Sequence, residues 1–341
     1  MQSNLSKKIL IVGSGATSSL ENSYVRAART LGHEVFLFDP AAEVNKHVKL
    51  GKMGRVLHQF LPIEAWTRKM NRELVLKARD TKPDLILVFT NVKVLYGTLA
   101  TIKTMLQTKI AWIWPDTPLN LTSHNLDCAG LFDVSAVYSS KAVEVFEKIG
   151  FPNNHWVPLA GDPELHGFEP VNGNNFNVDI SFVGMWRPER EKVLAVIAEK
   201  FPDLNLEIYG TYWKDRCGNA QLRKLCKGTG IVGRDLGAYF NKTRININVI
   251  DDTNYPAANM RFFEIPTAGG LQLSSPCPEQ ETVFRDKQEI LFFKSDAELI
   301  EKIEWVMAHP DASAAIRKSA HQKLMEGQTY AHRLQQILSI I

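Results

Sequence analysis

The chain has 341 residues, of which 45% are apolar and 23% are charged, and its formal net charge at pH 7 is +3. This length suggests two domains, and the composition is typical of a soluble globular protein. No apolar run approaches the ~20 residues that cross a membrane, and residues 1–14 lack the apolar core of a signal peptide. We therefore expect a cytoplasmic protein without a transmembrane segment.

The four cysteines are far apart and form neither a CxxC nor a CxH pair; they are Cys128, Cys217, Cys226 and Cys277. This spacing is typical of reduced thiols and indicates neither a zinc site nor a disulfide framework. We expect no metal and no cofactor. The charge is uneven, because residues 1–160 hold 19 Lys/Arg against 13 Asp/Glu and the remainder holds 21 against 24. The basic first half and the slightly acidic second half are therefore expected to meet different partners.

The first half alternates short apolar runs with helical patterns, as in a doubly wound parallel sheet. Strands are expected at residues 8–12, 34–38, 85–89, 109–114, 134–138 and 155–158. A glycine-rich turn, Gly13-Ser14-Gly15, follows the first strand and matches a dinucleotide fingerprint only in part, because the third glycine is replaced by Ser18. A nicotinamide or flavin site is one interpretation. In the other, the turn passes close to a helix or to the acceptor or sugar substrate.

Between residues 46 and 79 the chain is basic, and the apolar residues Ile63, Trp66, Met70 and Leu74 recur at helical spacing within it. The basic positions are Lys46, His47, Lys49, Lys52, Arg55, His58, Arg68, Lys69, Arg72, Lys77 and Arg79. The pattern predicts an amphipathic helix with a basic outer face. That face is either simply solvated or a landing site for an anionic acceptor, such as nucleic acid, a glycan, a peptide or a membrane surface.

A rigid loop, Pro115-Asp116-Thr117-Pro118, follows the fourth strand at the sheet edge where open α/β sheets bind ligands. Asp116 is our candidate for a catalytic or sugar-contacting residue, and a plain turn aspartate is the alternative. Residues 161–177 are rich in Gly, Pro and Asn and are expected to form a linker. After them the alternation restarts, with strands expected at residues 179–183, 206–209, 245–250, 271–273 and 290–293.

The segment from Asn254 to Ser275 carries the most informative pattern of the second half. Asn254 is expected to cap a helix that runs to Gly269-Gly270, with Arg261 and Glu264 on one face near its start. The N–H groups and positive partial charge of a helix start, beside an arginine, suit a phosphate. A carboxylate one turn further on can accept hydrogen bonds from a ribose diol. A surface ion pair on an ordinary helix is the alternative interpretation.

Several short motifs between residues 179 and 333 resemble those of GT-B glycosyltransferases, and more closely those of the CgeB-like spore-maturation group. They are Phe182-Val183-Gly184 with Arg187 and Arg190, Ile208-Tyr209-Gly210 with Trp213, Ile245-Asn246-Ile247-Asn248, Asn259-x-Arg261-x-Phe263-Glu264, Gly269-Gly270 and Thr329-Tyr330-x-x-Arg333. In residues 1–160 the resemblance rests on Lys82-Pro83-Asp84, the loop at Asp116 and the segment from Leu159 to Pro163.

The resemblance implies two Rossmann-like, doubly wound domains facing a central cleft. Their expected bounds are 1–160 for the acceptor domain, 161–177 for the linker, 178–325 for the donor domain and 326–341 for a C-terminal helix packing back towards the first domain. It also implies a transferase that uses a nucleoside-diphosphate sugar, held by Gly184, Arg187, Arg190, Tyr209, Gly210, Asn259, Arg261 and Glu264. In this scheme Glu264 binds the ribose, and Arg261 with Arg187 or Arg190 faces the diphosphate, so that no metal is required.

Two departures from the family pattern limit what the resemblance implies. Many retaining enzymes of this fold carry a second glutamate eight positions before the ribose-binding one, where this chain has Pro256. Retention or inversion is therefore not assigned. Pro266 would clash with a helical carbonyl, which predicts a short or kinked helix. A sugar-nucleotide epimerase, a non-catalytic sugar- or polymer-binding module and a nicotinamide enzyme remain as alternatives. The sugar, the base, the acceptor and the oligomeric state stay open.

Overall fold

The computed structural model describes residues 6–48, 51, 53–54, 56, 63–89, 93–171 and 175–341. The chain divides into two compact units, of which unit 1 comprises Met1–Pro158 with Arg333–Ile341, and unit 2 comprises Leu159–His332. Each unit holds one six-stranded parallel sheet with helices between consecutive strands, so the predicted α/β class and the doubly wound topology are confirmed. The basic residues Lys49, Lys52, Arg55 and His58 lie outside the described residues.

The sheet of unit 1 has the strand order β2-β1-β3-β4-β5-β6. Its strands are β1 (Lys8–Val12), β2 (Glu34–Phe38), β3 (Leu85–Phe89), β4 (Lys109–Trp114), β5 (Val134–Val137) and β6 (Asn154–Trp156). The three central strands are apolar on both faces because helices cover both. The chain runs from β1 to β2 on one side and then returns to β3 on the other, which creates a topological switch point between β1 and β3.

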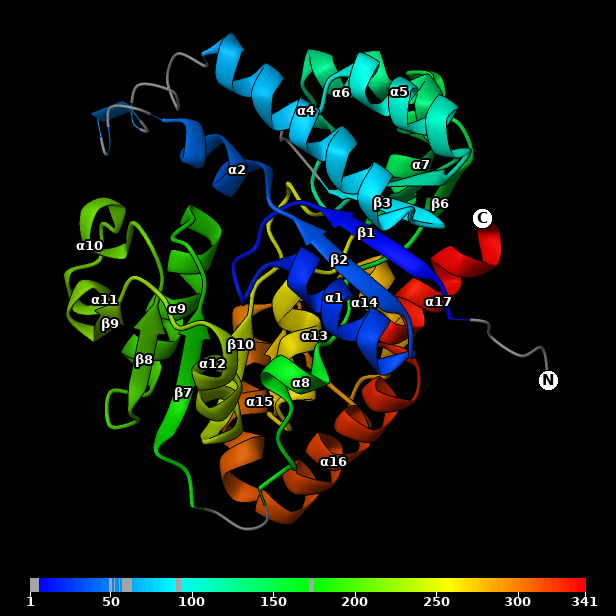
Figure 1. Cartoon of the computed structure of the whole chain (residues 1–341). Coiled ribbons are helices and arrows are strands. Elements are labelled where there is room, and N and C mark those ends of the chain that lie inside the picture. Colours follow the sequence, from blue (N-terminus) through cyan, green and yellow to red (C-terminus); the bar gives the residue numbers. More distant parts are fainter. Residues whose placement is uncertain are drawn as a thin grey trace. The chain divides into compact units, whose positions relative to one another are not determined.

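Helices α4, α5 and α7 pack on one face of this sheet, and α1 covers the other (Figure 1). The helices of this part of the chain are α1 (Leu20–Thr30), α2 (Pro40–His47), α4 (Glu64–Thr81), α5 (Tyr96–Leu106), α6 (Ser123–Cys128) and α7 (Ser140–Lys148), with short 3-10 turns at Pro118–Asn120 and Ala129–Leu131. The predicted amphipathic helix is α4, because Met70 and Leu74 are fully buried in the core of unit 1. Trp112 forms the centre of that core, where it stacks on Phe132 and Phe151.

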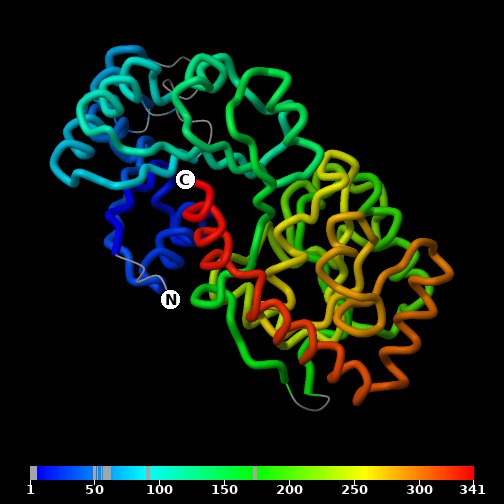
Figure 2. The backbone as a smooth tube through the Cα atoms, turned by 90° about the vertical axis from the view of Figure 1, so that its right-hand side faces the viewer, coloured from blue at the N-terminus to red at the C-terminus, as the bar shows by residue number. Residues whose placement is uncertain are grey.

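The last helix, α17 (Tyr330–Ile340), returns the chain to unit 1. Arg333 Nε donates to the carbonyl of Pro158 at 3.0 Å, and Gln336 Nε2 donates to that of Trp156 at 2.9 Å. In Figure 2 the C-terminal end (red) lies beside the blue segment of unit 1. The first unit is therefore built from both ends of the chain.

The sheet of unit 2 has the strand order β12-β11-β10-β7-β8-β9. Its strands are β7 (Val178–Val183), β8 (Leu206–Tyr209), β9 (Cys226–Gly228), β10 (Thr243–Asn248), β11 (Gln272–Ser274) and β12 (Leu291–Phe292). The chain runs outward from β7 to β9 and then crosses back to place β10 beside β7. The switch point of this sheet therefore lies between β7 and β10.

One face of this sheet packs on α9, α11 and α15, and the other on α12 and α13. The helices of unit 2 are α8 (Pro163–His166), α9 (Pro188–Lys200), α10 (Trp213–Arg216), α11 (Ala220–Leu225), α12 (Gly233–Asn241), α13 (Met260–Thr267), α14 (Pro278–Val283), α15 (Asp296–Ala308) and α16 (Pro310–Gly327). Helix α8 lies within the stretch for which the sequence predicts a linker, and unit 2 begins at Leu159.

One expected helix boundary is wrong. The sequence predicts a helix that begins at Asn254, whereas α13 begins at Met260 and has Asn259 as its N-cap. The side chain of Asn254 instead donates to Asp251 Oδ1 at 2.8 Å, because this stretch forms a turn and not a helix. The helix ends at Thr267, one residue after Pro266, so the expectation of a short helix is confirmed.

Asn71 joins α4 to the segment that leads into α5. Its Nδ2 donates to the carbonyls of Thr67 and Lys93 at 2.9 and 3.0 Å. Its Oδ1 accepts from the backbone N–H of Leu95 at 2.9 Å and from Thr98 Oγ1 at 2.8 Å. Asn71 is buried, so a substitution leaves these partners without a replacement.

We expect Asn71→Ala to lower the free energy of unfolding by about 1–3 kcal/mol, because buried donors and acceptors lose their partners. Urea denaturation measures this change. The exposed Thr101 on α5 provides a control, because its hydroxyl donates only to the carbonyl of Gly97. Thr101→Ala should change stability by no more than about 0.5 kcal/mol. Equal stabilities of the two variants would contradict the prediction.

Candidate functional site

The candidate site of unit 2 lies at the carboxyl ends of β7 and β10. These two strands pair in the centre of the sheet and form its switch point, where ligands of open α/β sheets bind. Strand β7 ends at Val183, β10 ends at Asn248, and α13 begins at the same edge after the turn that follows β10. The predicted donor residues lie on these three elements and on β8 and α9.

Polar residues on β10 connect the sheet to the start of α13. Asn259 accepts from the backbone N–H of Phe262 at 3.2 Å through its Oδ1, which caps the helix. Its Nδ2 donates to Asn248 Oδ1 at 2.8 Å, and Asn248 is buried. The Nδ2 of Asn248 has no hydrogen-bond partner among the described residues. A buried donor without a partner at a helix start is a place where a ligand oxygen can bind.

Arg261 and Glu264 form an ion pair on α13, as expected from their spacing. Arg261 Nε also donates to the carbonyl of Val183 at 2.9 Å, which holds the arginine over the end of β7. Glu264 is buried, and its Oε2 accepts from Arg261. Its Oε1 makes no hydrogen bond within the part of the chain that the structure describes.

Arg190 makes a different contact from the one that the sequence suggests. Its Nη2 donates to Asp251 Oδ2 at 2.8 Å, and its Nη1 donates to the carbonyl of Met185 at 2.9 Å. The side chains of Arg190 and Asp251 are only 10% and 5% exposed. Burial lowers the pKa of Arg190, and the charge of Asp251 opposes this shift. Arg190 therefore joins the segment after β7 to the turn after β10, and its guanidinium is already paired.

Arg187 is the arginine with the most unused hydrogen-bonding capacity at this edge. It occupies the N-cap position of α9, and its Nε is buried without a hydrogen-bond partner among the described residues. No ion pair of Arg187 occurs in that part of the structure either. The sequence predicted that Arg261 would face a diphosphate together with Arg187 or Arg190. In the structure Arg190 pairs with Asp251 and Arg261 pairs with Glu264, whereas Arg187 has no ion pair among the described residues.

Gly184 and Gly210 pack directly against each other at the ends of β7 and β8. A Cβ built on Gly210 would lie 1.8 Å from the carbonyl oxygen of Gly184, so only glycine fits there. Trp213 Nε1 donates to the same oxygen at 2.8 Å. The ring of Tyr209 meets that of Tyr239 edge-on at 5.2 Å. These contacts make a rigid wall with an aromatic ring beside the site.

The glycine-rich turn of unit 1 is occupied by carboxylates of its own unit. The N–H of Ser14 donates to Glu21 Oε1 at 3.0 Å, and the N–H of Gly15 donates to Asp39 Oδ2 at 2.7 Å. A Cβ on Gly13 would lie 2.4 Å from the Glu21 side chain. A diphosphate would need these N–H groups and would meet two carboxylates there. The geometry therefore favours the interpretation in which the glycines let the turn pass close to a helix.

Asp116 follows β4, and both of its carboxylate oxygens are used within its own loop. Oδ1 accepts from the N–H of Thr117 and Oδ2 accepts from Asn120 Nδ2, both at 2.7 Å. This is the local hydrogen bonding of a turn aspartate. A catalytic role for Asp116 stays a prediction.

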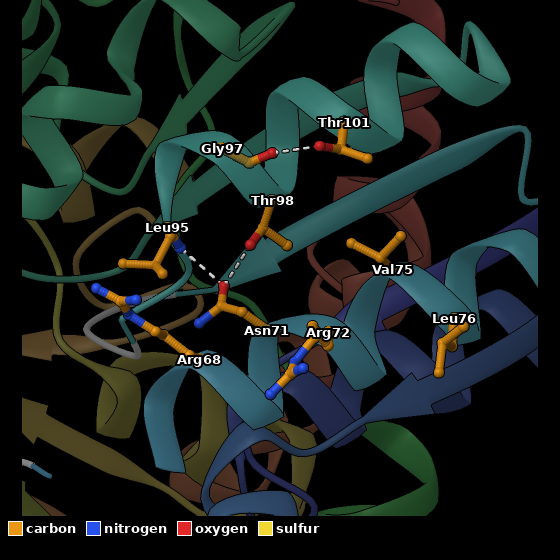
Figure 3. A pocket seen from close by; sticks show the side chains of 9 residues that line it. All are labelled: Arg68, Asn71, Arg72, Val75, Leu76, Leu95, Gly97, Thr98 and Thr101. Carbon is orange, nitrogen blue, oxygen red and sulfur yellow. Dashed lines mark hydrogen bonds between the residues drawn. The ribbon is translucent and has the colours of Figure 1, made fainter. Parts of the chain in front are cut away.

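A groove of about 730 Å³ lies between α4 and α5 on unit 1 (Figure 3). Its lining is apolar and neutral apart from two arginines and consists of Arg68, Asn71, Arg72, Val75, Leu76, Leu95, Gly97, Thr98 and Thr101. Arg68 forms an exposed ion pair with Glu64, whereas Arg72 has no ion pair among the described residues. The start of α5 follows β3 and therefore lies at the carboxyl edge of the first sheet.

Within the described part of the chain, no group of three His, Cys, Asp or Glu side chains is placed to hold a metal ion. The absence of such a group leaves open whether the protein needs a metal ion. All four cysteines are buried and unpaired with one another, and burial raises the pKa of both Cys128 and Cys277 to about 11. None of the described helices has the length and apolar character needed to span a bilayer.

Comparison with known proteins gives a family match to part of the chain. Residues 187–339 match the model of a family described as glycosyl transferase-like. No curated protein matches the chain. The matched segment includes α9, α13 and most of the candidate donor residues.

Among solved structures, HepE of Anabaena in complex with UDP-glucose is similar over 98% of both chains, with a TM-score of 0.64 and 14% identity. A glycosyltransferase from Rickettsia africae is similar over 98% of this chain and 97% of that one, with a TM-score of 0.68 and 11% identity. A candidate UDP-N-acetylglucosamine 2-epimerase from Listeria monocytogenes covers 98% and 95%, with a TM-score of 0.58 and 11% identity. The expected GT-B fold is thereby confirmed.

The sequence analysis assigned no role in the site to Asp251 or to Asn248. The buried partner of Asp251, Arg190, lies 61 positions away. Asn248 carried a signal, because alternating asparagines in a buried strand need partners that an apolar core does not supply. Gly161 and Thr329, from two motifs far apart in the sequence, pair through an isolated β-bridge.

We expect Arg190→Met to lower the free energy of unfolding by about 3–5 kcal/mol, because it leaves the buried carboxylate of Asp251 without a cation. Adding Asp251→Asn should recover part of this loss, since the second change removes the unpaired charge. Denaturant unfolding of the two single variants and the double variant measures the coupling. Arg187→Met, three positions earlier and without an ion pair, is the matched control and should change stability by less than about 1 kcal/mol. If the effects of the two substitutions on the free energy of unfolding are simply additive, the prediction is contradicted.

Proposed function

We propose that this protein is a glycosyltransferase that moves a sugar from a nucleoside-diphosphate donor, bound by unit 2, to an acceptor bound by unit 1. The observation that carries the proposal is the juxtaposition of Arg187, Arg261, Glu264 and the capped start of α13 at the switch point of the second sheet. The match of residues 187–339 to a glycosyl transferase-like family supports it. The finer assignment to the CgeB-like group rests on the motifs alone.

The chemistry follows from how charge changes during transfer. When the bond between the sugar and the β-phosphate oxygen breaks, the leaving nucleoside diphosphate gains negative charge. Under this proposal Arg187 and the positive end of α13 stabilise that charge. They perform the task that a divalent metal performs elsewhere. Glu264 Oε1 accepts a hydrogen bond from a ribose hydroxyl, and Arg261 fixes the carboxylate.

The donor proposal is tested by calorimetric binding of UDP, GDP, dTDP, ADP and NAD. We expect one nucleoside diphosphate to bind, and Glu264→Ala to weaken it by more than tenfold, or about 1.4 kcal/mol. Glu301→Ala is the control, because Glu301 is an exposed carboxylate on α15. Binding of NAD in place of a diphosphate, or equal binding without Glu264, would contradict the site.

Arg187 supplies a second test of the same site. Because its guanidinium has no partner in the described structure, Arg187→Met should weaken the diphosphate by at least tenfold with little effect on stability. The diphosphate and the nucleoside should be compared by calorimetry. A role in diphosphate binding predicts that affinity for the diphosphate falls and affinity for the nucleoside does not. Loss of affinity for both the diphosphate and the nucleoside would show that Arg187 contacts the base or stabilises the fold.

For the acceptor, we propose an anionic molecule bound on the basic side of unit 1. The groove between α4 and α5 supports this, because among the described residues that line it the charged ones are Arg68 and Arg72, both cations (Figure 3). Its floor is held rigid by the four hydrogen bonds of Asn71. Nucleic acid, glycan, peptide and membrane-surface acceptors all satisfy the charge requirement.

Gly97 offers a way to fill this groove without disturbing the fold, because a Cβ added there has no atom within 4 Å. We expect Gly97→Leu to slow sugar transfer at least tenfold and to leave hydrolysis of the donor unchanged. Gly97→Ala is the control and should retain transfer, since one methyl group occupies little of the groove. Radiolabelled sugar transfer and release of nucleoside diphosphate are measured in parallel. If Gly97→Leu transfers sugar at the wild-type rate, the acceptor does not bind in this groove.

A sugar-nucleotide epimerase is the second candidate, and the fold favours neither function, because a candidate epimerase is among the similar structures. An epimerase converts the donor without any acceptor. Incubation of the wild type with the donor alone, followed by chromatography of the sugar nucleotide, separates the two. A new sugar nucleotide in the absence of acceptor would contradict the transferase proposal.

A further inference from the structure

Unit 2 contains a small cavity between β10 and the start of α16, away from the candidate donor site. Its volume is about 10 Å³, which is the space that one water molecule or one ion of similar size needs. The lining residues used below are Phe176, Arg244, Ser313 and Arg317. The cavity stands out because its charged lining residues are both cations.

Arg317 on α16 is a buried cation with unused hydrogen-bond donors. Its residue is 2% exposed, and its Nη2 donates to the carbonyl of Arg244 at 3.2 Å. Its Nε and Nη1 have no acceptor within the described residues. Burial and the nearby charge of Arg244 lower the pKa of Arg317 to about 10, which still leaves it protonated at pH 7. A buried charge with unpaired N–H groups is costly unless a counter-charge is present.

Arg244 adds a second positive charge to the same cavity. Both guanidiniums lie over the ring of Phe176, at 5.6 Å for Arg244 and 4.6 Å for Arg317. Arg244 Nε is 3.7 Å from Asp179 Oδ1, and Asp179 is the only described carboxylate within 4 Å of either guanidinium. One carboxylate therefore faces two cations. Arg244 Nε is also buried without a hydrogen bond among the residues that the structure describes.

The start of α16 adds to the positive electrostatic potential of the cavity. The cavity lies against Pro310 and Ser313 in the first turn of this 18-residue helix. His309 at the N-cap makes no side-chain capping hydrogen bond. The positive end of the helix dipole thus points towards a site that two arginines already make positive. Asp311 in this turn is exposed and does not line the cavity.

We propose that this cavity binds a monatomic anion, which is chloride under ordinary conditions. The charge favours an anion, because the buried guanidinium of Arg317 and the partly buried guanidinium of Arg244 face one carboxylate. The size excludes phosphate and sulfate, whose tetrahedral oxygens do not fit a space for one water molecule. The ion accepts from Arg317 Nε and Nη1 and thereby balances the charge of Arg317.

The bound ion would stabilise the unit that carries the candidate donor site. Helix α16 contacts α13 through His321 Nδ1, which lies 2.9 Å from the carbonyl oxygen of Pro266. Arg317 joins the same helix to β10. The inference does not depend on the proposed function, because it uses none of the residues assigned to the donor or the acceptor.

The test is the thermal midpoint of the full chain at constant ionic strength, with chloride replacing gluconate, which is too large for the cavity. We expect the midpoint to rise by about 2–5 °C between 5 and 500 mM chloride and to level off, as for saturation of a single site. Arg317→Met should abolish this rise. Arg234→Met is the matched control, because exposed Arg234 lies at the same 4.6 Å from the ring of Phe168. This variant should keep the full chloride response.

Crystals grown in bromide provide an independent measurement, in which we expect an anomalous peak between Arg244 and Arg317. If Arg317→Met does not fold, Arg317→Lys replaces it, and its chloride response should be weaker, since the Nε and Nη1 donors are lost. Equal midpoints in chloride and gluconate, together with no bromide peak, would show that the cavity holds water only and would overturn the proposal. An equal chloride response in Arg317→Met would overturn it as well.

Discussion

The buried ion pair between Arg190 and Asp251 determines how the candidate donor site is held together. The arginine lies on α9, which follows β7, and the aspartate lies in the turn that follows β10. These two strands form the switch point of the second sheet, so the pair fixes the two segments that border the site. Asp251 also accepts from the backbone N–H of Asn254 and so shapes the turn that leads to α13. Without the pair, the start of α13 would be held at this edge only by the contacts of Arg261 with Val183 and of Asn259 with Asn248.

The sequence predicted the architecture well because parallel sheets leave a strong pattern. Strands covered on both faces are continuous apolar runs, and β3, from Leu85 to Phe89, is an example in which every residue is buried. The prediction from sequence was wrong at the start of α13. Asn254 and Pro256 fit the pattern of a helix start, but Asn259 is the actual N-cap. Local capping rules cannot distinguish the two asparagines, since the choice depends on Asn248, a residue from another strand.

Within the candidate site, residue types were easier to predict than their partners. The pairing of Arg261 with Glu264 follows from helical spacing, and the structure contains it. The pairing of Arg190 with Asp251 joins positions far apart in the sequence and could not be read from local spacing. At Gly13 and Gly15 the sequence pattern was misleading, because it suggests a phosphate-binding loop. There Glu21 and Asp39 occupy the N–H groups, a contact that only the folded unit reveals.

The assignment of residues 333–341 to unit 1 has a consequence for how the protein is made. Residues 1–158 are synthesised before unit 2, but the segment that completes their unit is synthesised after unit 2. During synthesis, the carbonyls of Trp156 and Pro158 therefore lack the donors that α17 later supplies. Unit 2 can be complete before unit 1 is, which reverses the order in which domains usually fold on the ribosome. Premature termination near the C-terminus would thus damage the unit that was synthesised first.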